Sequence, residues 1–134
     1  MGWSLFKEET KLVVTLLSRA NDREVEGGSS ILTIRITNRG RKAASIKSIK
    51  IKSNHGKFEF APKFLTADNL PYNLEVGEKC FAETTIKELV QQLVSKGYDK
   101  KVKVWVDVED STNKIHRSMA SLMLDIDKLR KKYL

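Results

Sequence analysis

The sequence predicts a mainly β protein, an antiparallel β-sandwich with one inserted amphipathic helix and a C-terminal helical tail. Three observations predict this fold. Short segments that alternate apolar and polar residues recur along the chain, and this period of two is typical of half-buried strands. Turn-forming residues separate these segments at intervals of roughly 8–12 residues, as in β-sandwiches. One segment near residue 90 changes to the 3.6-residue period of an amphipathic helix.

The composition is that of one globular domain over residues 1–134. Hydrophobic residues make up 40% of the chain and charged residues 31%, which is the usual balance of a folded domain of this size. No apolar run approaches the ~20 residues of a membrane-spanning helix, so we expect no integral membrane segment. The single cysteine, Cys80, allows no internal disulfide, and we therefore expect a cytoplasmic protein.

The first half of the chain contains the clearest strand patterns. Residues 1–9 are expected to form an N-terminal arm, and the β-branched and apolar residues of 10–19 predict the first strand. Residues 31–37 alternate strictly, which predicts a second strand with one buried face. In the next predicted strand, 44–53, Ile46 is out of phase with the later isoleucines. A β-bulge near Lys47 would restore the alternation.

The helix follows a segment that is expected to lack regular structure. Residues 57–60 predict a short strand, 61–77 a long loop, and 78–84 a further strand. An apolar stripe then predicts the helix over 85–97. Its members are Ile86, Leu89, Val90, Leu93 and Val94. Thr85 and Glu88 have the spacing of a capping box, and Gly97 suits the helix end.

A valine-lined strand and a tail complete the prediction. Four valines alternate with polar residues over 102–108, and 109–113 form a hairpin turn into 114–118. The C-terminal tail, 119–134, has two interpretations. Its apolar residues fit a helix, in which the basic residues near the end would complement the helix C-terminus. Residues 119–124 could equally first extend the preceding strand.

Four segments in order carry a resemblance to a known group of proteins. They are 34–40 with its Asn-x-Gly turn, 46–49, 74–78 with its leucine–glycine–glutamate element, and 104–112. Together they resemble small immunoglobulin-like β-sandwich proteins encoded by bacteria and their phages. The resemblance covers about residues 30–118. It implies an immunoglobulin-like fold and no catalytic residue, because the group shares none.

The residues do not favour an enzyme, a metal site or a cofactor site. Cys80 has no neighbouring base that could activate it, and we expect it to be a buried strand residue. Two histidines without metal-ligand spacing do not suggest a zinc site. The acidic residues Asp107, Glu109 and Asp110 are expected in solvent at a strand end and turn. A pair between one of them and His116, across the hairpin, is expected to be exposed.

Positive charge is concentrated in one stretch of the chain. The formal net charge is +8, and residues 39–63 hold eight lysines and arginines against one acidic residue, Glu59. Concentrated positive charge attracts polyanions and acidic protein surfaces. Two predicted strands that are neighbours in immunoglobulin topology carry lysines at alternate positions. These lysines would extend the positive charge across one face of the sheet. The expected face consists of Arg41, Lys42, Lys50, Lys52, Lys101 and Lys103, with Trp105 at its edge.

We therefore expect a non-enzymatic protein-interaction or structural module. Its partner would be another protein, one with an acidic surface being the natural match, and residues 119–134 could also join two copies of the chain. The alternative is nucleic-acid binding, in which the basic face would contact phosphates and Trp105 would stack on bases. A third interpretation is that the lysines only keep an exposed face soluble.

Overall fold

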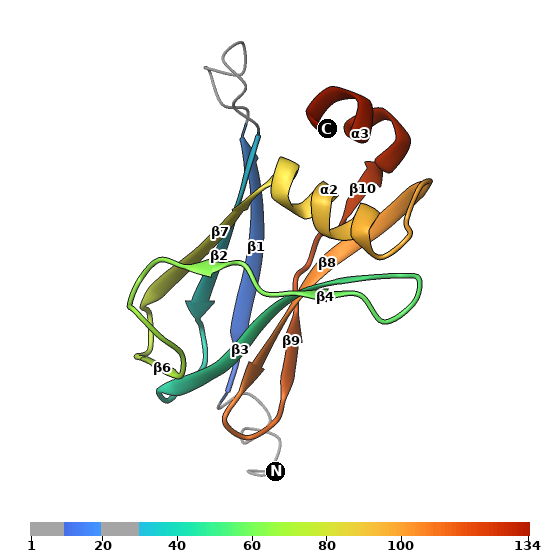
Figure 1. Ribbon diagram of the computed structural model, residues 1–134. Coiled ribbons are helices and arrows are strands. Elements are labelled where there is room, and N and C mark those ends of the chain that lie inside the picture. The colour runs from blue at the N-terminus through green and yellow to red at the C-terminus, as the bar shows by residue number, and fades with distance from the viewer. Residues whose placement is uncertain (1–9, 20–29) are drawn as a thin grey trace.

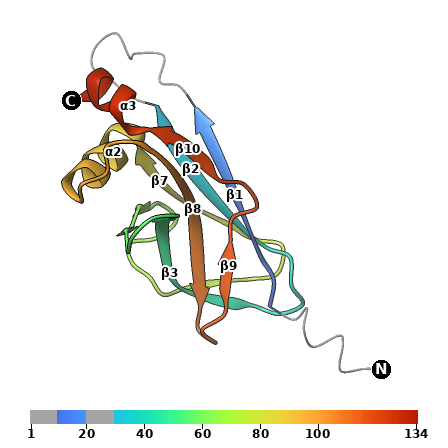
Figure 2. The same ribbon diagram turned by 90° about the vertical axis from the view of Figure 1, so that its right-hand side faces the viewer.

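The computed structural model describes residues 10–19 and 30–134, which form two antiparallel β-sheets with two helices at one end (Figure 1). One sheet has four strands in the order β1-β2-β7-β5. Their bounds are β1 Leu12–Arg19, β2 Ile31–Asn38, β7 Lys79–Thr85 and β5 Lys63–Phe64. The second view shows the two sheets packed face to face, with β1 and β2 in one and β3 and β8 in the other (Figure 2).

The other sheet has six strands, and its long members are β3 and β8. The path through it is β10-β8-β3-β4, while β6 also pairs with β3 and β9 with β8. Their bounds are β10 Leu122–Asp125, β8 Lys101–Asp110, β3 Ala44–Ser53, β4 Glu59–Phe60, β6 Tyr72–Leu74 and β9 Ile115–Arg117. The predicted bulge is confirmed, because the β3–β8 register shifts between Ile46 and Ser48. The extra residue brings the isoleucines before and after it onto the same buried face.

Apolar side chains from both sheets fill the space between them. Ile34 and Ile36 of β2 are fully buried, as are Ile51 of β3 and Val106 of β8. These positions are the apolar phase of each alternating strand, so the sequence pattern itself places them in the core.

The predicted helix is α2, Ile86–Ser95, and its buried residues are four of the five in the predicted stripe. Thr85 caps it, because its hydroxyl oxygen accepts a hydrogen bond of 3.1 Å from the backbone N–H of Glu88. At the other end Gly97 has φ +90°, a left-handed conformation that glycine adopts without a steric penalty. The Gly97 and Tyr98 N–H groups then donate to the carbonyls of Val94 and Leu93. This is the hydrogen-bond pattern of a Schellman motif.

The tail combines both of its predicted forms. The strand β10 extends the sheet along β8, and α3, Ile126–Tyr133, follows with Asp125 as its N-cap. Leu122, one of the apolar residues of the tail that fit a helix, lies in the strand. The two helices contact each other at one end of the molecule (Figure 1). Neither described helix has the length and apolar character needed to span a membrane.

The prediction of a long loop over 61–77 was incomplete. This segment contains β5 and β6, which have two and three residues. Strands this short show no periodicity, so their pairing depends on neighbours that a local pattern does not show. Phe64 and Tyr72 pack against each other with ring centres 5.5 Å apart, which fixes the two short strands together. The predicted N-terminal arm lies outside the described residues.

The burial of the α2 stripe predicts a large loss of stability when it is truncated. Leu89 is 0% exposed, so Leu89→Ala should lower the free energy of unfolding by about 2–5 kcal/mol. Urea denaturation followed by circular dichroism measures this change. The matched control is Gln91→Ala on the exposed face of the same helix, which should change the unfolding midpoint little. Equal effects of the two substitutions would show that α2 does not pack on the core.

Candidate functional site

The outer face of the six-stranded sheet carries a tryptophan at its centre. Val104 and Val106 point into the core, so the alternation of β8 turns Trp105 outward. Its cross-strand neighbour in β3 is Lys52. The guanidinium group of Arg117, from β9, lies over the indole, 4.6 Å from the ring centre. This is a cation–π contact, in which the positive charge is attracted to the electron-rich ring face.

A buried carboxylate holds Arg117 in this position. Asp107 is only 4% exposed, and its two oxygens accept hydrogen bonds of 2.9 and 3.3 Å from the guanidinium group of Arg117. The hydrogen bond to Asp107 raises the pKa of Arg117. Lys52 also approaches Asp107, with 3.4 Å between the charged atoms. The expectation that Asp107 lies in solvent was wrong, because Lys52 and Arg117 from the neighbouring strands cover it.

Two hollows flank Trp105. One has a volume of about 340 Å³ and is bordered by Lys103, Arg117 and Met119. The other has a volume of about 330 Å³ and lies toward Lys52 and the β3–β4 turn. The indole N–H of Trp105 is buried without a hydrogen-bond partner. The aromatic ring therefore separates two depressions in which a partner's side chains could be seated.

Exposed methionines continue this surface toward the edge of the sheet. Met119 is 88% exposed and Met123 63% exposed. Met123 lies opposite Lys103 in the β8–β10 pairing, on the same face as Trp105. Methionine side chains are flexible and adapt to different partners. We use the name Trp105 surface for the group Trp105, Arg117, Met119 and Met123.

The structure places part of the expected basic face here. Lys50, Lys52, Lys101 and Lys103 all lie on the outer face of β3 and β8, as alternation predicted. The charge of the first two is largely balanced. Glu59 lies 3.3 Å from the amino group of Lys50 and 3.7 Å from that of Lys52. This part of the face is therefore mixed in charge.

Arg41 and Lys42 are not part of this surface. They lie in the loop between β2 and β3, before β3 begins at Ala44. Lys52 lies near the other end of β3, and a ten-residue strand is roughly 30 Å long. The six basic residues thus extend along the whole sheet and do not form one compact patch.

Sequence reasoning missed Arg117, Met119 and Met123. A signal for Arg117 was available in the predicted hairpin. With a tight turn after Asp110, the residue opposite Asp107 is Arg117, as the observed register shows. The two methionines carried no comparable signal, because their exposure depends on how residues 118–121 leave the sheet.

The second acidic residue that we expected in solvent forms the centre of the β8–β9 hairpin. Asp110 is 1% exposed, and one of its carboxylate oxygens accepts hydrogen bonds from the Thr112 N–H, the Thr112 hydroxyl and the Lys114 N–H. The other oxygen lies 2.8 Å from Nε2 of His116. The carboxylate–histidine pair is therefore buried, and the expectation of an exposed pair was wrong.

His116 connects this hairpin to the other sheet. Its Nδ1 accepts a hydrogen bond of 3.3 Å from the backbone N–H of Leu12 in β1. Because Nδ1 is an acceptor, Nε2 carries the proton and donates a hydrogen bond to the Asp110 carboxylate. Both nitrogens are thus engaged inside the protein. The arrangement suits a structural link between the sheets better than proton transfer to a substrate.

The remaining candidates for chemistry are the single cysteine and a metal site. Cys80 is fully buried, and burial raises the pKa of its thiol to about 12. The thiolate, which is the nucleophilic form, is therefore scarce at neutral pH. Within residues 10–19 and 30–134, no cluster of three or more His, Cys, Asp or Glu side chains could hold a metal ion.

Comparison with known proteins finds a structural likeness only. No protein-family model and no curated protein sequence matches the chain. Among solved structures, the chain is similar to the crystal structure of the "Putative ApaA Protein" from Bordetella pertussis, with a TM-score of 0.50 and 15% sequence identity. The match covers 88% of this chain and 95% of that chain. At this identity the likeness shows a shared mainly β, two-sheet fold.

The hydrogen bonds of Asp110 predict a loss of stability in acid. Burial alone would raise its pKa, but the hydrogen bonds from His116, Thr112 and Lys114 together hold it below its usual value. The folded state then binds this proton less readily than the unfolded chain. The stabilisation is complete above the unfolded-state pKa, about 4, and is lost as pH falls through the lower folded-state value.

Asp110→Asn should remove this part of the acid sensitivity. At pH 7 the substitution should also lower the free energy of unfolding by about 1–3 kcal/mol, because it breaks the buried hydrogen bond from His116. Urea unfolding measured between pH 2 and pH 7 tests both expectations. Asp68→Asn, at an exposed carboxylate, is the control. If both variants keep the parent's pH dependence, Asp110 does not contribute to the acid response.

Proposed function

We propose that this protein is a non-enzymatic protein-interaction module that binds its partner through the Trp105 surface. The composition of that surface supports the proposal. Tryptophan, arginine and methionine are enriched at the centres of protein–protein interfaces, and tryptophan and arginine are the most frequent binding hot spots. Here the indole and the guanidinium group are already held against each other. These two side chains are already ordered, so binding a partner costs less side-chain conformational entropy.

The charges around the surface support a protein partner over a nucleic acid. Phosphates would have to compete with Glu59 and Asp107 for Lys50 and Lys52. Lys101 and Lys103 remain exposed at the rim of the surface. Charges at the rim of an interface raise the rate of association more than the affinity. The partner that fits best has apolar side chains for the two hollows and acidic groups beside them. Nucleic-acid binding through Lys101, Lys103 and Trp105 is the alternative.

The inert state of the buried polar groups supports a role without catalysis. Asp110 and His116 are occupied by hydrogen bonds within the fold, and the Cys80 thiol is protonated and buried.

We also propose that the two-sheet fold is an immunoglobulin-like sandwich, related to the small bacterial and phage proteins that the sequence resembles. Supporting this are the two packed antiparallel sheets and the likeness to a bacterial protein structure.

A photo-crosslinking residue at Met119 tests the proposed interface directly. In cells that express this protein, benzoylphenylalanine at this position should form a discrete protein adduct. Trp105→Ala and Arg117→Ala should each reduce the yield of that adduct about tenfold or more, as expected for hot-spot residues. An adduct between two copies of this chain would show that the partner is a second copy and that the protein forms a homo-oligomer.

The control places the same crosslinker at Val76, which is exposed in the turn between β6 and β7. It should not form the adduct. A nuclease-sensitive adduct would favour the nucleic-acid alternative. A protein adduct that persists in both alanine variants would contradict the proposed interface.

A further inference from the structure

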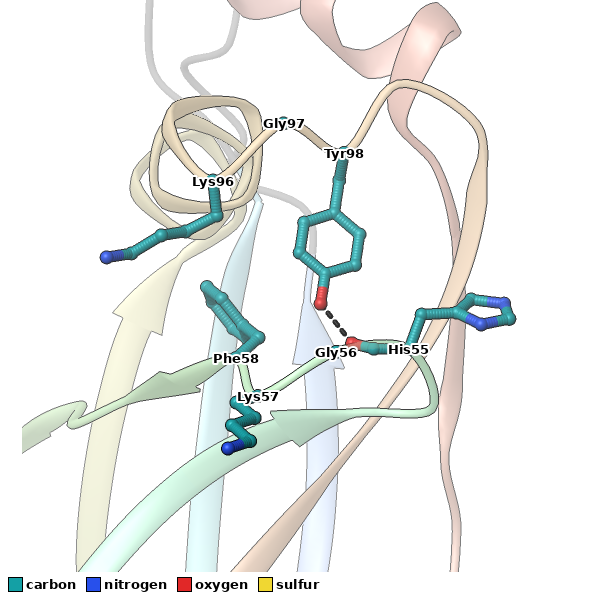
Figure 3. A pocket seen from close by; sticks show the side chains of 7 residues that line it. All are labelled: His55, Gly56, Lys57, Phe58, Lys96, Gly97 and Tyr98. Atoms are coloured by element: carbon teal, nitrogen blue, oxygen red, sulfur yellow. Dashed lines mark hydrogen bonds between the residues drawn. The ribbon is translucent and has the colours of Figure 1, made fainter.

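A larger hollow lies between the β3–β4 turn and the C-terminal end of α2 (Figure 3). Its volume is about 460 Å³, which is within the usual range for small-molecule sites. Phe58 and Tyr98 line its apolar part, with their rings edge to face and their centres 5.9 Å apart. Figure 3 shows Lys96 on the wall formed by the end of α2 and Lys57 on the wall formed by the β3–β4 turn. The amino groups of both lysines point away from the rings of Phe58 and Tyr98, and the ring of His55 is also turned away.

Hydrogen bonds fix the two walls of this hollow against each other. The Tyr98 hydroxyl donates to the carbonyl oxygen of His55, and the Ser53 hydroxyl donates to the same oxygen at 2.7 Å. Gly56 has φ +67°, and a Cβ atom there would lie 2.9 Å from the Tyr98 hydroxyl. Glycine is therefore required where the turn meets the tyrosine. A hollow held in this way is formed before any ligand arrives, which lowers the entropic cost of binding.

The walls of the hollow are positively charged. Residues 53–58 and 89–98 contain no aspartate or glutamate. Within the described part of the chain, the amino groups of Lys57 and Lys96 have no ion-pair partner. The carbonyls at the end of α2 would repel an anion, but those of Leu93 and Val94 accept hydrogen bonds in the Schellman motif. Of the acidic residues next to these ranges, Glu59 is paired with Lys50 and Lys52, and Asp99 is exposed beside Tyr98.

The surrounding end of the molecule has the same sign of charge. Residues 96–103 and 125–134 together hold eight lysines and arginines against three aspartates. The contact between α2 and α3 brings these two segments to the same end (Figure 1). A concentration of positive charge raises the local concentration of anions and their rate of binding. This cluster is distinct from the stretch 39–63, because it forms only when the chain folds.

We propose that this hollow binds a small phosphomonoester that carries an apolar or aromatic group. Both lysines, Lys57 and Lys96, are exposed, and their side chains turn toward the hollow when the phosphate binds. The phosphate dianion then accepts charge-assisted hydrogen bonds from both ammonium groups. The apolar group packs on Phe58 and Tyr98. Gly56, Lys57 and Phe58 also line one of the hollows beside Trp105, whereas Lys96 and Tyr98 line this hollow and neither of the two beside Trp105. The effect of a substitution at Lys96 therefore distinguishes this proposal from that of the Trp105 surface.

Phenyl phosphate is the probe that matches both features of the hollow. Titration at pH 7.5 and low ionic strength, followed by amide chemical shifts, should show saturable binding with the largest shifts at Gly56 and Gly97. Inorganic phosphate, which lacks the ring, should bind several-fold more weakly, and phenol should show no saturation. Lys57→Gln and Lys96→Gln should each weaken phenyl phosphate binding about tenfold.

Lys79→Gln is the matched control, because Lys79 is exposed on the other sheet. It should leave the affinity unchanged. Equal weakening by all three lysine substitutions would show only a general charge effect and would overturn the proposal. The absence of saturation up to ~10 mM phenyl phosphate would also overturn it. A much tighter complex with a single-stranded oligonucleotide, with shifts extending over α3, would replace it with a polynucleotide surface.

Discussion

The buried carboxylate of Asp110 fixes the β8–β9 hairpin, and the Trp105 surface depends on that hairpin. Three hydrogen bonds from Thr112 and Lys114 to one carboxylate oxygen set the turn. The turn sets the register, and the register places Arg117 opposite Asp107. Arg117 can then bind Asp107 and cover the indole of Trp105. The contact of Arg117 with Trp105 is thus a consequence of one correctly formed turn.

The same carboxylate also connects the two sheets. Through His116 it is joined to the backbone of Leu12 in β1, which belongs to the other sheet. Burying a charge is costly unless it is fully hydrogen-bonded. Asp110 meets this condition with four donors, so its burial is compatible with stability and favours one arrangement of the sheets. Asp107 is covered in a different way, by two cations from neighbouring strands.

Local periodicity was sufficient to predict most of the framework. Residues that are close together in the sequence are enough to predict the alternation of β2 and β8, the bulge in β3 and the capped stripe of α2. The short strands β5 and β6 were not predicted, because their pairing partners are distant in sequence. The burial of Asp107 and Asp110 was not predicted for a related reason. An acidic residue in a turn is usually in solvent, and only the packing of β1 and β9 shows that Asp110 is not.

Charge along the chain was a poorer guide to the candidate sites. The stretch 39–63 is basic, but folding separates Arg41 and Lys42 from Trp105 and pairs Lys50 and Lys52 with carboxylates. Folding also brings two short basic runs, 100–103 and 128–132, to the same end of the molecule beside α2 and α3, and the sequence pattern did not show that they lie together. The distribution of charge on the surface therefore depends on topology, which the sequence pattern does not contain.

The dependence of the Trp105 surface on Asp110 can be measured through the exposure of Trp105. In a Trp3→Phe background, acrylamide quenching of fluorescence reports on Trp105 alone. We expect Asp110→Ala and Arg117→Ala to increase quenching by similar amounts, and the double substitution to add little to either, because both release the guanidinium group from the indole. Unchanged quenching in a folded Asp110→Ala protein, alongside increased quenching in Arg117→Ala, would contradict the account.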